Sequence, residues 1–139
     1  MSKTKKVKKT RVQLVKGMKD ILLDEQPYWA TVRNRVANMA KNYSFSRIDT
    51  PIVEFTSLFK RTVGEETDIV SKEMYSFVTQ GGDKLSLRPE NTAGVVRSYV
   101  EHGMLNLPQP VKTFYIGPQF RHDKPQAGRY RQFWQFGFE

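Results

Sequence analysis

The chain has 139 residues, enough for one domain at most, and its 23 basic and 14 acidic residues give a net charge of +9. It contains no cysteine and only His102 and His122, which excludes a disulfide framework and argues against a metal site. No apolar run is long enough to span a membrane, and the basic N-terminus lacks the apolar core of a secretion signal. A cytoplasmic protein is therefore expected.

The positive charge is concentrated at the N-terminus, where residues 1–16 hold seven basic side chains and no acidic one. The remaining residues carry 16 basic and 14 acidic side chains, a difference of only +2. Such a run is typical of a solvated, disordered arm. Contact with a nucleic acid is the alternative, because lysine and arginine bind phosphates regardless of sequence. We expect residues 1–16 to form a basic disordered arm and residues 17–139 to form the domain.

A helix over residues 26–43 is the first predicted element, because its apolar residues recur every three or four positions. Asp24 is the expected N-cap, and Pro27 falls in the first turn, where proline is tolerated. Residues 44–54 are predicted to be extended. Pro51 restricts them to a sheet edge or an interface, since proline donates no hydrogen bond to a neighbouring strand. The inner stripe of the helix is predicted to be Trp29, Val32, Val36, Met39, Ala40 and Tyr43.

The middle of the chain predicts a short helix over residues 57–63 and a polar loop over residues 64–68. Residues 74–79 and 84–88 have the pattern of two strands of a hairpin, joined through Gln-Gly-Gly-Asp.

A second long helix is predicted over residues 91–102, with Gly103 as its C-terminal stop. Its inner stripe is predicted to be Ala93, Val96, Tyr99 and Val100. A strand, a polar loop and a second strand then close the chain over residues 112–139. The expected fold class is α+β, an antiparallel β-sheet flanked by helices on one face. Because the chain stops at Glu139 within a strand pattern, without a turn or cap, we expect a fragment of a longer protein.

The last strand sorts its side chains by face, because alternate residues of a strand point to opposite sides of the sheet. The predicted packed face carries Trp134, Phe136 and Phe138. The opposite face carries Phe133, Gln135, Gly137 and Glu139. A glycine inside a strand often marks the close approach of a ligand or another backbone. The second face is therefore predicted to be the floor of a small-molecule site.

Three further features supply binding groups, and each has a simpler alternative. Glu90 lies where a strand gives way to a helix, and the helix dipole favours its ionised form, a receptor for an ammonium group. Helix capping alone is the simpler interpretation. Arg121 is suited to fork onto a phosphate, although an isolated arginine is usually a surface residue. Phe133 offers a stacking platform for a purine, with plain core packing as its alternative.

Four segments together closely resemble the catalytic core of class II aminoacyl-tRNA synthetases, and specifically the histidyl-tRNA synthetase family. They are KGMKD at residues 16–20, FSRIDTPIVE at 45–54, LRPENTAGVVR at 87–97 and FYIGPQFRHDKPQAGRYRQFWQFGFE at 114–139. The resemblance covers nearly all of residues 16–139. It implies the N-terminal part of the catalytic domain, with the first motif as a dimer interface and the second as two strands and a loop. The third motif and the anticodon-binding domain lie outside it.

The resemblance also implies roles for the ATP side of the site. Arg121 would bind the ATP α-phosphate, stabilise the charge that develops there and contact the histidine substrate. Asp123 would lie near the adenine, where the family often has Glu, and Phe133 would stack on that ring. Arg129 and Arg131 would face the triphosphate or the tRNA acceptor end.

On the histidine side, the resemblance implies that Glu90 and Thr92 hold the α-ammonium group, with Asn91 beside them and Gln135 assisting. Glu139 would accept a proton from the imidazole. Two departures from the family pattern are modest. Trp134 replaces an expected His on the packed face, and Asn91 stands where Gly is frequent.

The implied reaction has two steps. Histidine and ATP, which carries Mg²⁺, give histidyl-adenylate and pyrophosphate, and the histidyl group then moves to the 3′ end of tRNA(His). The protein itself supplies no metal ligands in this scheme. A homodimer without membrane attachment is implied, and the fragment alone is expected to have weak or no activity.

Two rival functions remain open from the sequence. One is a histidyl-tRNA synthetase-like regulatory subunit of ATP phosphoribosyltransferase, which binds histidine without activating it. The other is a generic RNA-binding module that depends on the basic arm.

Overall fold

The computed structural model describes residues 12–64 and 67–139. Two short helical segments are not α-helices: η1 (Ile69–Glu73) is a π-helical turn, and η2 (Met104–Asn106) is a 3₁₀ turn. In chain order the elements are α1 (Gln26–Asn42), β1 (Ser46–Arg47), β2 (Val53–Phe55), α2 (Thr56–Val63), η1 (Ile69–Glu73), β3 (Ser76–Val78), β4 (Lys84–Leu87), α3 (Thr92–Glu101), η2 (Met104–Asn106), β5 (Thr113–Phe120) and β6 (Gln132–Phe138).

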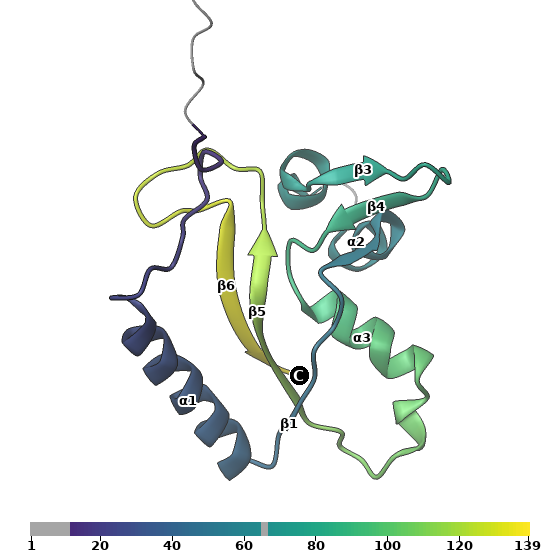
Figure 1. Cartoon of the computed structure of the whole chain (residues 1–139). Helices are drawn as coiled ribbons and strands as arrows, with labels where there is room; N and C mark the ends of the chain where they lie inside the picture. The colour runs from purple at the N-terminus through teal and green to yellow at the C-terminus, as the bar shows by residue number, and fades with distance from the viewer. Residues whose placement is uncertain (1–11, 65–66) are drawn as a thin grey trace, which may run out of the picture.

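The strands form two three-stranded sheets with the orders β1-β5-β6 and β2-β4-β3. Both predicted hairpins are present, since β3 pairs with β4 and β5 pairs with β6 in antiparallel fashion. The short β1 pairs with β5 in parallel, which the hairpin pattern did not predict. The α+β class is confirmed, with the strands divided between two sheets. Helix α1 lies along one side of the β5–β6 hairpin, while α3 and the second sheet lie on the other (Figure 1). The prediction of helices on one face only was therefore wrong, because the second sheet and α3 cover the side opposite α1.

Pro51 lies between two edge strands, as its missing N–H group requires. The extended segment predicted over residues 44–54 contains β1 and β2, and each occupies the edge of its sheet. The first half of the segment therefore joins one sheet and the second half joins the other.

The main apolar cluster lies between α1 and the sheet that contains β5 and β6. Val36, Ala40 and Phe114 are buried there, and Phe45, Ile116 and Phe138 pack against them. The rings of Phe45 and Phe138 meet edge to face with centroids 5.0 Å apart. Trp134 meets Trp29 of α1 at 5.6 Å, also edge to face. The predicted packed face of the last strand is confirmed at Trp134 and Phe138, whereas Phe136 is 49% exposed and the prediction was wrong there.

Helix α1 differs from its prediction at its start and on its flanks. Glu25 rather than Asp24 is the N-cap residue, and no side-chain hydrogen bond caps the helix. Of the predicted inner stripe, Val32, Met39 and Tyr43 are exposed. The β5–β6 hairpin is narrow, so it covers only the centre of the apolar face of α1.

Helix α3 ends as predicted but buries a different face. Gly103 follows its C-cap residue with a left-handed φ of 62°, which glycine adopts without a Cβ clash. Val96 and Val100 of the predicted inner stripe are exposed, and the prediction was wrong at both. The buried residues are Ala93, Gly94, Val95 and Ser98.

Close approach of a neighbouring chain segment explains this face of α3. A Cβ on Gly94 would lie 3.0 Å from Thr50 Oγ1 and 3.6 Å from Glu54 Oε1. Arg97 forms an ion pair with the buried Glu54 of β2 at 2.6 Å. Small residues and one ion pair, rather than the largest apolar residues, therefore set the orientation of α3.

The remaining predictions divide between confirmed and untested. The short helix is confirmed as α2, whereas the π-helical turn η1 was not predicted. Residues 1–11 of the predicted basic arm and residues 65–66 of the predicted polar loop lie outside the described residues. Residues 12–15 form neither helix nor strand. Among the helices in the described ranges, none has the length and apolar content needed to cross a membrane.

Candidate functional site

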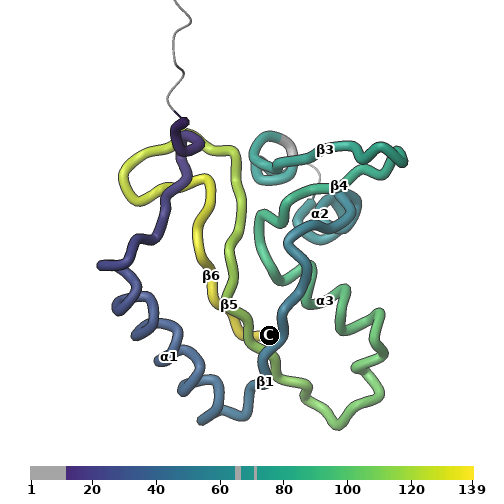
Figure 2. The backbone as a smooth tube through the Cα atoms, in the orientation of Figure 1, coloured from purple at the N-terminus to yellow at the C-terminus, as the bar shows by residue number. Residues whose placement is uncertain are grey.

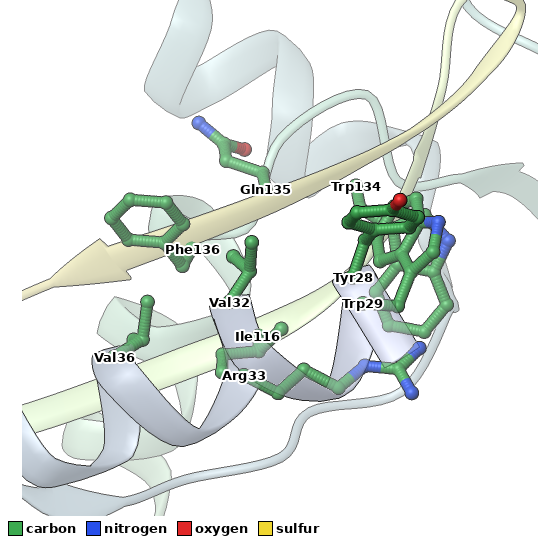
Figure 3. A pocket seen from close by; sticks show the side chains of 9 residues that line it. All are labelled: Tyr28, Trp29, Val32, Arg33, Val36, Ile116, Trp134, Gln135 and Phe136. Atoms are coloured by element: carbon green, nitrogen blue, oxygen red, sulfur yellow. The ribbon is translucent and has the colours of Figure 1, made fainter. Parts of the chain in front are cut away.

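The floor predicted from the last strand is a two-stranded surface on the side of the sheet opposite α1. Three residue pairs share it through the β5–β6 register: Tyr115 with Gly137, Gly117 with Gln135, and Gln119 with Phe133. Paired residues of neighbouring strands point to the same face. In Figure 3, Gln135 points away from α1.

The connection between β4 and α3 lies along the edge of β5, beyond the point where β1 ends. Phe120 N–H donates to the Arg88 carbonyl at 3.0 Å. Arg121 Nε donates to the Pro89 carbonyl, also at 3.0 Å. These bonds continue the edge of the sheet and bring the start of α3 to the floor. Thr92 and Glu139, 47 positions apart in the chain, are thereby placed on one surface.

One end of this surface gathers the residues assigned to histidine. Thr92 Oγ1 donates to Glu139 Oε1 at 2.7 Å, and the Tyr115 hydroxyl is hydrogen-bonded to Thr92. Glu90 Oε1 accepts the N–H of Ala93 at 3.0 Å, so this carboxylate caps α3, as the simpler interpretation proposed. A carboxylate has a second oxygen, and Glu90 is only half-buried, so capping leaves room for a ligand ammonium group.

The other end gathers the residues assigned to ATP. The Arg121 guanidinium carbon lies 5.2 Å from the centroid of the Phe133 ring. Both residues line a cavity of about 220 Å³ together with residues of the β5–β6 loop. The full lining is Arg121, Asp123, Gly128, Arg129, Tyr130 and Phe133. All three residues assigned to ATP from the sequence therefore line one cavity.

The Asp123 carboxylate is engaged at both oxygens. Oδ1 accepts the N–H of Lys124 at 2.6 Å, and Oδ2 forms an ion pair with Arg129. Arg129 also lies 3.9 Å from Glu73 Oε1. This arrangement orders the loop beside the cavity and places a cation next to Arg121.

Arg121 and Glu139 lie on the same side of the sheet. Arg121 contacts Phe133 of β6. Glu139 follows β6 with its backbone still paired to Thr113, so Phe133 and Glu139 lie on one face by alternation. The six residue steps from Phe133 to Glu139 span about 20 Å of extended chain. This length exceeds that of free histidine and leaves room for two ligands placed end to end.

Asn91 is buried beneath the floor, whereas Gln135 lies on it. Asn91 is 2% exposed, and its Oδ1 accepts a hydrogen bond from Thr50 at 3.2 Å. Its amide therefore supports the connection beneath the surface rather than lining it. Gln135 is half-buried on the floor, and its Oε1 is buried without a hydrogen-bond partner among the described residues.

Sequence reasoning missed three buried polar residues that build this surface. The Arg88 guanidinium donates to the carbonyls of Pro118 and Thr50 at 3.0 and 2.8 Å, and burial lowers its pKa. Tyr115 is 4% exposed, and burial raises the pKa of its hydroxyl. Gln119 is completely buried.

The glycines of the two strands were the signal for two of these residues. A Cβ on Gly117 would collide with the Arg88 guanidinium, and a Cβ on Gly137 would collide with the Tyr115 ring. Gly137 was interpreted as a point of close ligand approach. The structure instead places a protein side chain there, so glycine accommodates an internal contact.

A second cavity, of about 280 Å³, lies on the opposite face between α1 and β6 (Figure 3). Its walls are mostly aromatic and aliphatic. Arg33 lies over the rings of Trp29 and Trp134, with centroid distances of 5.5 and 4.8 Å. This cavity lacks carboxylates and is a gap in packing rather than a polar site. Over residues 12–64 and 67–139, no group of three or more His, Cys, Asp or Glu side chains is placed to hold a metal ion.

Comparison with known proteins gives a single consistent result. The family model described as histidyl-tRNA synthetase matches residues 17–139. The chain belongs to the histidyl-tRNA synthetase family. The resemblance drawn from its four segments is thereby confirmed.

Individual relatives agree with the family match. Histidine–tRNA ligase of Dehalococcoides mccartyi strain BAV1 is 58% identical over 127 residues, and that of strain 195 is 57% identical. Each alignment covers 91% of this chain and 30% of the relative. The chain therefore spans about a third of the length of these curated relatives.

Solved structures show the same fold. Apo histidyl-tRNA synthetase of S. aureus matches with a TM-score of 0.76 and 39% identity, covering 91% of this chain and 28% of that one. A Bacillus halodurans protein described as an ATP phosphoribosyltransferase regulatory subunit/histidyl-tRNA synthetase matches with a TM-score of 0.75 and 22% identity. That alignment covers 93% of this chain and 32% of the other. At this identity it shows the fold alone.

Proposed function

We propose that this chain is the part of a histidine–tRNA ligase that binds ATP and histidine. The complete gene product activates histidine with ATP to histidyl-adenylate and then transfers the histidyl group to the 3′ end of tRNA(His). The observation that carries the proposal is the shared face of Arg121 and Glu139. A guanidinium on an aromatic ring lies at one end of that face, and a Thr–Glu hydrogen bond lies at the other.

The ATP end is suited to a purine and a phosphate. Phe133 offers a ring face to the adenine, and Arg121, permanently charged, is placed to bind the α-phosphate. Asp123 and Arg129 line the same cavity as an ion pair, which places an Arg129 guanidinium with further N–H donors near the triphosphate. Mg²⁺ would arrive with ATP as part of the substrate and would offset the charge of the triphosphate.

The histidine end is suited to an amino acid with an ionisable ring. Glu90 and Thr92 hold the α-ammonium group, Gln135 assists from the floor, and Glu139 accepts a hydrogen bond from an imidazole N–H. An isosteric amino acid without a ring N–H would remove water from Glu139 without replacing the lost hydrogen bond, so Glu139 separates histidine from such amino acids.

The chemistry follows from this placement. The histidine carboxylate attacks the α-phosphorus in line, the bond to the β-phosphate oxygen breaks, and pyrophosphate leaves. Arg121 stabilises the charge that develops on the α-phosphate oxygens. Because the nucleophile belongs to the substrate, the protein contributes positioning and electrostatic stabilisation. The second step moves the histidyl group from the adenylate to a terminal hydroxyl of tRNA, and AMP leaves.

A homodimer in the cytoplasm is the proposed state of the complete protein. Val53, Phe55 and Phe77 are exposed, and by register they share one face of the β2-β4-β3 sheet. A cluster of exposed apolar side chains supports an interface, and β2 begins within the segment that resembles the first motif. Sedimentation at micromolar concentration measures the state, and a monomer would contradict this part of the proposal.

The regulatory-subunit function is the second candidate, because one structural neighbour carries that description. Such a protein binds histidine but forms no adenylate. The cavity shared by Arg121, Asp123 and Phe133 favours retained ATP binding and therefore the ligase.

The test is histidine-dependent exchange of pyrophosphate into ATP by the complete gene product, followed by charging of tRNA(His). The ligase requires both activities and saturable dependence on histidine. Histidine binding by calorimetry with no exchange would favour the regulatory subunit. The 139-residue chain alone is expected to show weak or no aminoacylation, and full exchange activity of this chain would contradict that expectation.

A further inference from the structure

The loop between β5 and β6 is tied to the segment that precedes α1. The two segments lie side by side at one end of the sheet in both views (Figures 1 and 2). Arg131 makes the connection. Its amide N–H donates to the Gly17 carbonyl at 2.6 Å, and its guanidinium donates to the Lys16 carbonyl at 3.2 Å. The second bond joins residues 115 positions apart in the chain.

The same guanidinium also holds the loop. Arg131 Nε donates to the Asp123 carbonyl at 3.0 Å, and the Arg131 carbonyl accepts the Arg121 N–H at 2.9 Å. Arg131 is therefore bonded to the residue that stacks on Phe133 and to the carboxylate residue beside it. Three N–H groups of one residue satisfy carbonyl oxygens from both segments.

Gly17 is shaped for this contact. Its φ is +85°, and a Cβ there would lie 2.8 Å from Arg131 Cδ and 2.9 Å from Pro125 Cγ. A side chain at position 17 would therefore push on both the Arg131 stem and the loop. The absence of a Cβ lets the backbone approach closely enough for the hydrogen bond from the Arg131 amide.

Arg131 itself does not line the ATP cavity. The cavity walls include Arg121 and Arg129, whereas the Arg131 guanidinium is directed at two backbone carbonyls. The family resemblance offered Arg131 as a contact for the triphosphate or tRNA. Its geometry instead fits a residue that acts through its neighbours.

We propose that Arg131 is a positioning residue of the candidate ATP site, and that residues 16–17 belong to that site through it. This inference rests on the proposed function. Without the two guanidinium bonds, the loop that carries Asp123 and Arg129 keeps only its backbone bonds and its ion pair, so it is less ordered before ATP binds. The entropy lost when ATP orders the loop then lowers the affinity for ATP. The histidine end is built on α3 and β6 and does not depend on the anchor.

The first experiment measures the KM for ATP and the KM for histidine in pyrophosphate exchange by the complete gene product. Arg131→Ala is expected to raise the KM for ATP about tenfold, because two hydrogen bonds to backbone carbonyls are lost. The KM for histidine should stay within about twofold, since the histidine end of the surface is built on α3 and β6 and does not contact Arg131. Equal changes in both constants would show a general loss of structure and overturn the proposal.

Arg131→Lys tests whether the hydrogen-bonding geometry of Arg131 or only its positive charge is needed. Lysine keeps the positive charge but has one nitrogen, so it cannot bond the Lys16 and Asp123 carbonyls with a planar fork. The proposal expects a KM for ATP that remains raised at least threefold, in line with loss of one of two hydrogen bonds. Full recovery with lysine would assign Arg131 to phosphate attraction and overturn the positioning role.

Gly17→Ala tests the other side of the contact, with Gly82→Ala as its matched control. Both glycines have positive φ, at +85° and +91°, but nothing lies within 4 Å of a Cβ on Gly82. Backbone strain is therefore shared, and only Gly17→Ala disturbs Arg131. A raised KM for ATP in Gly17→Ala alone supports the proposal. Equal effects of the two variants would contradict it.

The double variant Gly17→Ala with Arg131→Ala measures the coupling between the two positions. Since the added methyl collides with Arg131 Cγ and Cδ as well as with Pro125 Cγ, its effect on the KM for ATP should shrink once the Arg131 stem is removed, leaving only the part due to Pro125. Additive effects would mean that the two positions act independently, against the proposal.

Hydrogen–deuterium exchange gives a readout that does not require catalysis. Arg131→Ala should raise exchange in peptides covering residues 121–131 and 12–20, but not in α3. Raised exchange without a change in ATP affinity would overturn the positioning role. Failure of the unsubstituted protein to bind ATP by calorimetry would instead contradict the proposed function, and the role in ATP binding with it.

Discussion

The two faces of the β5–β6 hairpin carry different kinds of residue. Toward α1, Phe114 and Phe138 pack with helix residues, and their rings lie 6.2 Å apart in a stacked arrangement. Away from α1, the same strands present the Tyr115 hydroxyl, the amides of Gln119 and Gln135, and the Glu139 carboxylate. Gly117 leaves space for the Arg88 side chain, and Gly137 leaves space for Tyr115. One pair of strands thus serves as core on one side and as a candidate ligand surface on the other.

The difference shows how burial is stabilised on each face. The α1 face buries apolar rings and requires no polar partners. The ligand face buries Arg88, Tyr115 and Gln119, so it depends on hydrogen bonds that reach into neighbouring segments. Substitutions on the first face should therefore change stability, and substitutions on the second should change binding.

Phe114→Ala has the largest expected effect and acts on the packed face. Phe114 is 7% exposed within the main apolar cluster. Removing a buried phenylalanine ring should lower the free energy of unfolding by about 3–5 kcal/mol. Chemical denaturation of the complete gene product measures this change. A loss below about 1 kcal/mol would show that the α1 face is not the structural core.

Arg121→Ala should act almost entirely on the ligand face. Loss of one preorganised charge contact at the transition state should reduce pyrophosphate exchange by about 100-fold or more, with a smaller change in stability. Arg33→Ala is the control on the α1 face, where the guanidinium lies over two tryptophan rings. Pyrophosphate exchange by Arg33→Ala should remain within about twofold of that by the unsubstituted protein, far less than the loss expected for a catalytic residue. Similar losses for the two arginines would remove the distinction between the faces.

Glu139→Gln should weaken histidine binding about tenfold, because a hydrogen bond to a charged group contributes about 1.5 kcal/mol or more. ATP affinity should stay the same, since Glu139 lies at the far end of β6 from Phe133. Calorimetric titration with each ligand separates the two effects. A loss of ATP binding equal to that of histidine binding would argue against an imidazole contact at Glu139.

Tyr115→Phe has the smallest expected effect and tests polar burial by pH. Burial raises the pKa of Tyr115 above its ordinary value of 10.0. The unfolded chain therefore loses this proton first as the pH rises past about 10, and the folded state loses stability above that pH. Below pH 10 this contribution is fully present. Tyr115→Phe should make the fall in unfolding free energy above pH 10 less steep, and an unchanged slope would contradict burial of the hydroxyl.

Much of the fold followed from local patterns in the sequence. Alternation in the last strand separated Trp134 and Phe138 from Phe133 and Glu139, because a strand leaves each side chain only two directions. The hairpins and the stop at Gly103 followed from turn and cap chemistry. These features depend on neighbours in the sequence, which a single chain displays directly.

Contacts between residues far apart in the chain could not be predicted from local sequence patterns. The orientation of α3 depends on Thr50 and Glu54, more than 35 residues away, so apolar periodicity selected the wrong face. The hydrogen bonds from Arg131 to the Asp123 and Lys16 carbonyls could not be predicted from the sequence either. In the candidate site, the sequence named Arg121 and Phe133. The buried Arg88, which bonds the Pro118 and Thr50 carbonyls, had no signal other than Gly117, which lies against it but far from it in the chain.

The most direct test of the central claim is a crystal structure of the complete gene product with a non-hydrolysable analogue of histidyl-adenylate. We expect the adenine on Phe133, the phosphate-equivalent group on Arg121 and the imidazole at Glu139, all on the face opposite α1. An analogue seated between α1 and β6, or one that contacts Arg121 while its imidazole lies away from Glu139, would contradict the account.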